Sequence, residues 1–277
     1  MKKICVSVFL LFIIIYANFG QAKEAWIQSS QNENIYVKID GMENAAHHKL
    51  AIIQHGLASN MNHPVVQTAK KAFLDNKFVV ITFDSRYSSG KGNNDVEKVR
   101  LATFVEDLET VVNWAKTHSF YSEPFALAGH SLGGASVIQF SAKHPHQVNV
   151  LVPVTPVVSG QLWEKSCMKN MSDFCRQWKE DGDYKYTDAR QQKTVSIPYA
   201  VVTDCASYDA AVLLPQIEAE TLVITAEKDI VIDTADVQSL SDKIKTGRVA
   251  LIKSSGHNFN NRQNQTDLYK VIDSFLK

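Results

Sequence analysis

The 277-residue sequence lacks the features that define several large classes of protein. Its 29 Lys and Arg side chains are balanced by 29 Asp and Glu, so it has no basic excess with which to displace phosphate counterions, and this argues against a dedicated nucleic-acid-binding protein. Four cysteines and no C-x-x-C pair argue against a disulfide-dense miniprotein, a zinc ribbon and a thioredoxin-type redox site. The length allows one large domain or two small ones. No internal repeat, low-complexity tract or interdomain linker is present, so we expect one domain.

No apolar run reaches the roughly 20 residues that span a bilayer as a helix. The N-terminal run extends for about 13 residues from Ile4 to Tyr16, follows two lysines, and gives way to small residues that end at Ala22. This pattern is typical of a secretory signal. We therefore expect residues 1–22 to be a signal peptide cleaved after Ala22, and the protein to be exported to the periplasm or the cell exterior. An uncleaved N-terminal anchor is the alternative.

Cleavage would leave a slightly acidic chain, because the 29 basic groups fall to 27 while the 29 acidic groups remain. Three cysteines would remain, Cys167, Cys175 and Cys205, in a compartment where disulfides persist. The simplest arrangement is one pair and one free thiol. On one continuous helix Cys167 and Cys175 would lie about 12 Å apart, beyond disulfide reach, so pairing them requires a turn such as residues 170–173 could supply.

Apolar runs of strand length alternate with longer segments of helical period, which is the signature of an α/β domain with a mostly parallel central sheet flanked by helices. The expected strands are residues 35–39, 49–54, 78–83, 125–128, 148–154, 221–225 and 249–252. The expected helices are residues 64–75, 100–118, 132–143, 234–244 and 265–276.

The alternation breaks between residues 159 and 215, where no regular strand pattern survives. This segment is charged, rich in aromatic residues, and holds all three cysteines that follow the signal. A segment of this kind between two buried strands is best interpreted as a largely helical lid over one end of the sheet. We therefore expect residues 23–277 to form a single domain with a cap insertion at about 159–215.

A Gly-His-Ser-Leu-Gly motif follows the expected strand 125–128 and leads into an expected helix. A strand-turn-helix of this kind strains the backbone of its serine and lifts the hydroxyl clear of the sheet, while the flanking glycines leave room for the crowded backbone. Ser131 is therefore the candidate nucleophile. Because a serine hydroxyl is a weak nucleophile at its ordinary pKa, a general base and a group to orient that base are also needed.

The candidates for these two groups each follow a later strand. Asp229 leaves the strand 221–225 and is the candidate acid, with Glu227 and Asp233 as nearby competitors. His257 leaves the strand 249–252 and is the only histidine downstream of Asp229. We expect His257 to accept the Ser131 proton and Asp229 to fix the tautomer of His257 and stabilise its imidazolium.

An acyl-transfer site also needs hydrogen-bond donors for the oxyanion that develops during the reaction. The backbone N–H of Leu132, directly after the nucleophile, is one candidate. The N–H of Leu57, which follows the His55-Gly56 step at the end of the strand 49–54, is the other. For His55 itself we favour a buried role that braces this loop.

No metal or organic cofactor is expected. His144 and His146 have the spacing of a metal-binding pair, but no third ligand stands nearby. Six histidines fall in turns or at polar helix ends, where they are expected to be solvated: His47, His48, His63, His118, His144 and His146.

With these motifs the chain resembles the α/β-hydrolase superfamily, in particular its capped serine esterases and lipase-like members, which include cinnamoyl esterases and lysophospholipase-like enzymes. The resemblance covers residues 49–157 and 215–277, and it includes a strand-end D-x-R step at Asp84-Ser85-Arg86. The Gly-His-Gly-x-Ser loop that follows this step in many relatives is altered here. The resemblance implies the α/β-hydrolase fold, with the lid inserted after the sixth strand.

These patterns predict a secreted serine hydrolase that cleaves carboxylic esters of small molecules through an acyl-serine intermediate. A serine aminopeptidase or amidase, or a thioesterase, is the alternative, because the same machinery serves those reactions. A set of carboxylates in the insertion could grip a free amine: Glu164, Asp173, Glu180, Asp181 and Asp183. A non-catalytic binding protein on the same scaffold is a third hypothesis. The sequence leaves the oligomeric state open.

Overall fold

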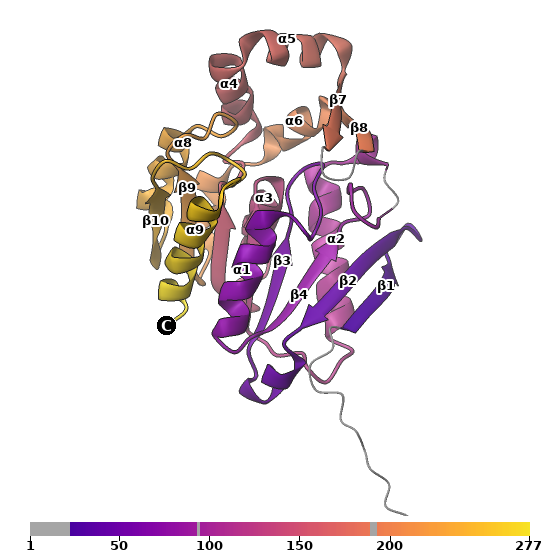
Figure 1. Ribbon diagram of the computed structural model, residues 1–277, viewed down its shortest axis with the longest axis vertical. Helices are drawn as coiled ribbons and strands as arrows, with labels where there is room; N and C mark the ends of the chain where they lie inside the picture. The colour runs from indigo at the N-terminus through magenta and orange to yellow at the C-terminus, as the bar shows by residue number, and fades with distance from the viewer. Residues whose placement is uncertain (1–22, 93–94, 189–192) are drawn as a thin grey trace, which may run out of the picture.

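The computed structural model describes residues 23–92, 95–188 and 193–277, which form an eight-stranded sheet between two layers of helices (Figure 1). The expected signal peptide, residues 1–22, lies outside the described residues. The antiparallel strands β1 and β2 form one edge, and the other six strands of the sheet, β3, β4, β5, β6, β9 and β10, run parallel to one another. In spatial order the strands are β1 (Lys23–Gln28), β2 (Asn34–Asp40), β4 (Val79–Asp84), β3 (Leu50–Gln54), β5 (Phe125–His130), β6 (Val148–Val154), β9 (Glu220–Ala226) and β10 (Gly247–Ile252).

The two faces of the sheet carry separate hydrophobic cores, because the central parallel strands are buried on both sides. On one face α1 (Pro64–Asp75) packs beside α9 (Arg262–Phe275), and on the other α2 (Leu101–Ala115) packs beside α3 (Leu132–Lys143). Each helix directs one apolar stripe at the sheet. In the described ranges, no helix combines the length and the apolar character needed to cross a membrane.

All seven expected strands are present, and the differences from the expectation are local. Strand β1 was not predicted, because its six residues alternate too briefly to give a periodic signal. The helix expected at 234–244 is in fact two short pieces, α8 (Thr234–Gln238) and the 3-10 turn η5 (Ser239–Lys243). Single 3-10 turns also occur at η1 (Met42–His47) and η2 (Val96–Lys98).

The segment between β6 and β9 lies beyond one end of the sheet, at the top of Figure 1. It is not as poor in strands as expected, because β7 and β8 pair as an antiparallel hairpin. In that hairpin Tyr184 and Tyr186 oppose Ile197 and Val195, an alternation that a period-two search would detect. The elements of the segment are α4 (Gly160–Asn170), α5 (Ser172–Asp181), β7 (Asp183–Asp188), β8 (Lys193–Pro198), α6 (Ala200–Asp204), η3 (Cys205–Ser207), α7 (Ala210–Leu213) and η4 (Leu214–Gln216).

A disulfide in the structure joins Cys167 on α4 to Cys175 on α5, with 5.7 Å between their Cα atoms. The chain breaks its helical path at Met171, between the two cysteines, which brings together residues that a continuous helix would separate. Cys205 carries a free, buried thiol. The arrangement is the one pair and one free thiol that the cysteine count favoured.

Candidate functional site

Ser131 occupies the turn between β5 and α3 in a strained backbone conformation, with φ 55° and ψ −117°. The turn is tight enough to require glycine on both sides. A Cβ atom on Gly129 would lie 2.2 Å from the Gly133 carbonyl oxygen, and one on Gly133 would lie 2.2 Å from the His55 carbonyl oxygen. The fold therefore presents Ser131 at the carboxyl end of the sheet, as the sequence motif predicted.

Asp229 and His257, which the sequence places on separate loops, meet at the same end of the sheet. The Nδ1 atom of His257 donates a hydrogen bond of 2.8 Å to Oδ2 of Asp229, whose side chain is only 1% exposed. The other carboxylate oxygen accepts the N–H groups of Val231 and Ile232, each at 2.9 Å. These bonds fix the carboxylate, and the carboxylate fixes the imidazole tautomer that leaves Nε2 as a proton acceptor.

The two competing carboxylates have other partners. Oε2 of Glu227 accepts the backbone N–H of Ser254 at 2.8 Å. Asp233 is the N-cap of α8, where it accepts the N–H of Ala235 at 3.0 Å, and it also pairs with Lys169 at 2.5 Å. Of the three candidate acids, it is therefore Asp229 that bonds to His257.

Ser131 and His257 line one cavity of about 220 Å³ that lies between the end of the sheet and the insertion. The insertion contributes Trp163, Tyr186 and Ile197 to its wall, which sequence reasoning did not identify. The described residues that line it carry no carboxylate: Gly56, Leu57, Ala58, Ser59, His63, His130, Ser131, Trp163, Tyr186, Ile197, Val231, His257 and Asn258.

Of the two candidate oxyanion donors, Leu57 lines this cavity and Leu132 directly follows Ser131, which also lines it. Leu132 is the first residue of α3, so its N–H has no acceptor within the helix. Leu57 lines the cavity from the segment between β3 and α1, in which Ala58 has a positive φ of 49°. His55 braces this segment as expected, because its Nδ1–H donates to the Gly56 carbonyl at 2.7 Å and its Nε2 accepts the Ser85 N–H at 3.1 Å.

Two further histidines surround the site. His63 stands at a helix end as expected, as the N-cap of α1; it is part-buried, lines the cavity and stacks on His130 with 4.9 Å between ring centroids. His130 is 3% exposed, and its Nε2 donates to the His257 carbonyl at 3.1 Å. Burial lowers the pKa of His130 well below its usual range, and the neighbouring His63 and His257 lower it further.

The lowered pKa of His130 predicts that stability falls in mild acid. In the unfolded chain a histidine takes up a proton below about pH 6.5, whereas native His130 stays neutral, so the free energy of unfolding decreases with falling pH by up to about 1.4 kcal/mol per unit. We expect His130→Gln, which keeps a donor for the His257 carbonyl, to show a shallower dependence in urea unfolding between about pH 7 and pH 5. Equal slopes for the two proteins would contradict this prediction.

Two other features carry no candidate catalytic group. His144 and His146 face the carboxylates of Glu109 and Glu218, at 3.7 and 3.3 Å, and the described residues contain no cluster of three or more metal-ligating side chains.

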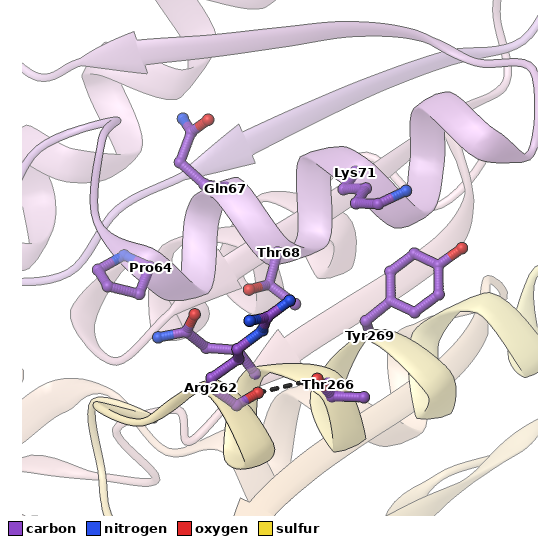
Figure 2. A pocket seen from close by; sticks show the side chains of 8 residues that line it. Pro64, Gln67, Thr68, Lys71, Arg262, Thr266 and Tyr269 are labelled. Carbon is purple, nitrogen blue, oxygen red and sulfur yellow. Dashed lines mark hydrogen bonds between the residues drawn. The ribbon is translucent and has the colours of Figure 1, made fainter.

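A hollow of about 430 Å³ lies between α1 and α9, and Figure 2 shows Arg262 at its edge. Its other cation, Lys71, is paired with Asp75 at 2.6 Å.

A parallel sheet between two helical layers, with a serine on the turn after β5, defines the α/β-hydrolase fold. The chain belongs to the family described as "Serine aminopeptidase, S33", which it matches over residues 45–263. A monoacylglycerol lipase of Mycolicibacterium smegmatis is 30% identical over 112 residues, which is 40% of this chain and 38% of the lipase. The chain therefore matches less than two fifths of that relative's length.

Solved structures share the fold over nearly the whole chain. Alpha/beta hydrolase domain-containing protein 10 from mouse has a TM-score of 0.69 at 17% identity, covering 92% of this chain and 98% of that one. Est1E from Butyrivibrio proteoclasticus, solved with ferulic acid bound, has a TM-score of 0.72 at 16% identity, covering 91% and 97%. At these identities the likeness establishes the fold alone.

Proposed function

We propose that the protein is a secreted serine hydrolase that cleaves carboxylic esters with Ser131, His257 and Asp229 as its catalytic triad. The observation that carries the proposal is the 2.8 Å bond from His257 to Asp229 at the cavity that Ser131 also lines. No metal or organic cofactor takes part in the proposed reaction. Residues 23–277 would form one domain, with residues 159–215 as the lid over its site.

In the proposed reaction His257 Nε2 takes the hydroxyl proton while Ser131 Oγ bonds to the ester carbonyl carbon. The N–H groups of Leu57 and Leu132 stabilise the resulting oxyanion. The intermediate collapses to an acyl-Ser131 ester, and the leaving alkoxide takes the proton from His257. Water, deprotonated by His257, then attacks the acyl carbon, and the second tetrahedral intermediate collapses as His257 returns the proton to Ser131 Oγ, which releases the acid and restores the serine hydroxyl.

The size of the cavity predicts a preference for small esters. Its volume of about 220 Å³ is below the roughly 300–1,000 Å³ of sites that enclose drug-sized ligands, and its wall is largely apolar. We expect kcat/KM for p-nitrophenyl esters to fall on the order of tenfold or more between butyrate and palmitate, because the longer chain has no room. Glycerol monoesters belong in the same assay because of the monoacylglycerol lipase relative. A flat or rising profile would contradict the prediction.

The family's description favours aminopeptidase activity as the second candidate. An aminopeptidase needs an anion for the free amine of its substrate, and the described cavity wall contains none. Of the carboxylates in the insertion, Glu164 is bonded to Lys179 at 2.6 Å. A panel of aryl esters, thioesters and aminoacyl anilides separates the alternatives. Faster turnover of anilides would favour the peptidase, and activity on none would favour a binding protein.

We also propose that the protein is exported after cleavage behind Ala22. The support is the sequence pattern of residues 1–22, together with the Cys167–Cys175 pair, which suits an oxidising compartment. Mass spectrometry of the protein purified from cell fractions, with and without reduction, tests both points. We expect a mature chain that begins at Lys23 and carries one disulfide. An intact N-terminus in a cytosolic fraction would contradict export.

A further inference from the structure

The strand-end step Asp84-Ser85-Arg86 has no part in the proposed reaction, yet it is buried beside the site. Asp84 is 1% exposed. Its Oδ1 accepts the backbone N–H of Met61 at 2.7 Å, and its Oδ2 accepts the backbone N–H of Lys91 at 2.8 Å. One carboxylate thus connects two separate segments of backbone, residues 55–61 and residues 84–91.

Two more hydrogen bonds join the same segments. The N–H of Ser85 donates to Nε2 of His55 at 3.1 Å, and the N–H of Ser89 donates to the Ser59 carbonyl at 3.1 Å. Residues 55–61 include Leu57, the candidate oxyanion donor, and a strained neighbour, Ala58. A strained segment keeps its conformation only where surrounding contacts determine it, and these bonds supply contacts on both sides of Leu57.

The segment 84–91 is itself fixed to the scaffold. Arg86 is fully buried, and its Nε donates to Oδ1 of Asp107 on α2 at 2.5 Å, while its backbone N–H donates to Oδ2 at 3.0 Å. Gly90 packs directly on the Asp84 carboxylate, since a Cβ atom at residue 90 would lie 2.3 Å from Cγ of Asp84. The Arg86–Asp107 hydrogen bonds, the backbone from Arg86 to Asp84 and the Asp84–Met61 hydrogen bond therefore form a continuous, rigid connection from α2 to Met61.

We propose that Asp84 is a positioning residue for the oxyanion donor Leu57, an inference that rests on the function proposed above. An oxyanion donor is effective only where it is aimed in advance at the position the developing charge will occupy. By accepting the Met61 N–H, the Asp84 carboxylate holds the segment of Leu57 against the rigid segment 84–91. This positioning stabilises the transition state and does not contribute to substrate binding.

The test is Asp84→Asn in the full mature chain. Asparagine can accept only one of the two N–H groups and turns its own NH2 toward the other. We expect kcat for a short aryl ester to fall about 10- to 100-fold with KM within about threefold. Affinity for an arylboronic acid, whose Ser131 adduct places a negatively charged oxygen at the oxyanion position, should fall by the same factor as kcat. The pH dependence set by His257 should not move.

Gly90→Ala provides a second variant if Asp84→Asn does not fold, because it keeps the carboxylate and displaces it. The same pattern is expected, with a smaller effect. Asp75→Asn, which alters a carboxylate bonded to Lys71 and Tyr269 at the far end of α1, is the control and should retain full activity.

The proposal is overturned if either folded variant keeps wild-type kcat and boronate affinity, or if its loss appears in KM alone. Failure of the proposed function is distinguishable from this. In that case wild-type protein itself would neither turn over the ester nor bind the boronic acid.

Discussion

Ser131→Ala is expected to lower kcat for a short aryl ester by about 10⁴- to 10⁶-fold, because without the hydroxyl no acyl-enzyme can form and the remaining triad groups act only as a unit. The fold should persist. Ser131 is 7% exposed, and its backbone N–H bonds to the Val154 carbonyl at 3.0 Å whatever the side chain. Stopped assays at high enzyme concentration, together with thermal unfolding, measure both quantities.

Ser136→Ala is the matched control. It makes the same substitution five positions along the chain, on α3, where the Ser136 hydroxyl is fully buried and has no hydrogen-bond partner in the described structure. Activity should be unchanged. A Ser131→Ala protein with more than a few per cent of wild-type turnover would show that another group performs the chemistry.

Asp229→Asn carries the second large expected effect, a fall in kcat of about 10⁴-fold. The amide can present its NH2 to Nδ1 of His257, which favours the tautomer whose proton sits on Nε2 and cannot accept the one from Ser131. The substitution also removes the charge that stabilises the imidazolium formed in the reaction. KM should change little, since Asp229 lies behind His257 and outside the residues that line the cavity.

Asp233→Asn is the control for Asp229→Asn. It removes a different negative charge from the same loop and so tests whether the loss of activity is specific to Asp229. Asparagine is as good an N-cap as aspartate, so α8 should remain intact. Only the surface pair with Lys169 would be lost. We expect near wild-type kcat for this variant. If Asp233→Asn and Asp229→Asn were equally impaired, the acid would have been assigned to the wrong residue.

The sequence predicts most of the site because of a rule of topology. Ser131, Asp229 and His257 each follow a parallel strand, and the carboxyl ends of parallel strands meet at one edge of the sheet. Contacts between residues far apart in the sequence are harder to predict where no periodic pattern in the sequence indicates them. His63 precedes α1, and only packing of α1 against the sheet brings it onto His130.

The sequence also does not identify which side chains of the insertion reach the cavity. Its aromatic content indicates a packed unit, but which side chains reach the cavity depends on the path of α4 and the hairpin. Trp163 and Tyr186, from these two elements, both reach the cavity wall. Trp178 instead donates its indole N–H to the Ile197 carbonyl at 2.8 Å and holds the hairpin against α5. Residue type alone does not distinguish these roles.

The central claim is that Ser131 is an activated nucleophile, and a fluorophosphonate probe tests it most directly. The probe phosphonylates a serine oxygen only where a base removes the proton and donors stabilise the charge on the phosphoryl oxygen. Peptide mass spectrometry of the labelled wild-type protein should place the adduct on Ser131, and His257→Ala should abolish the labelling. An unlabelled wild-type protein, or an adduct on any other residue, would contradict the account.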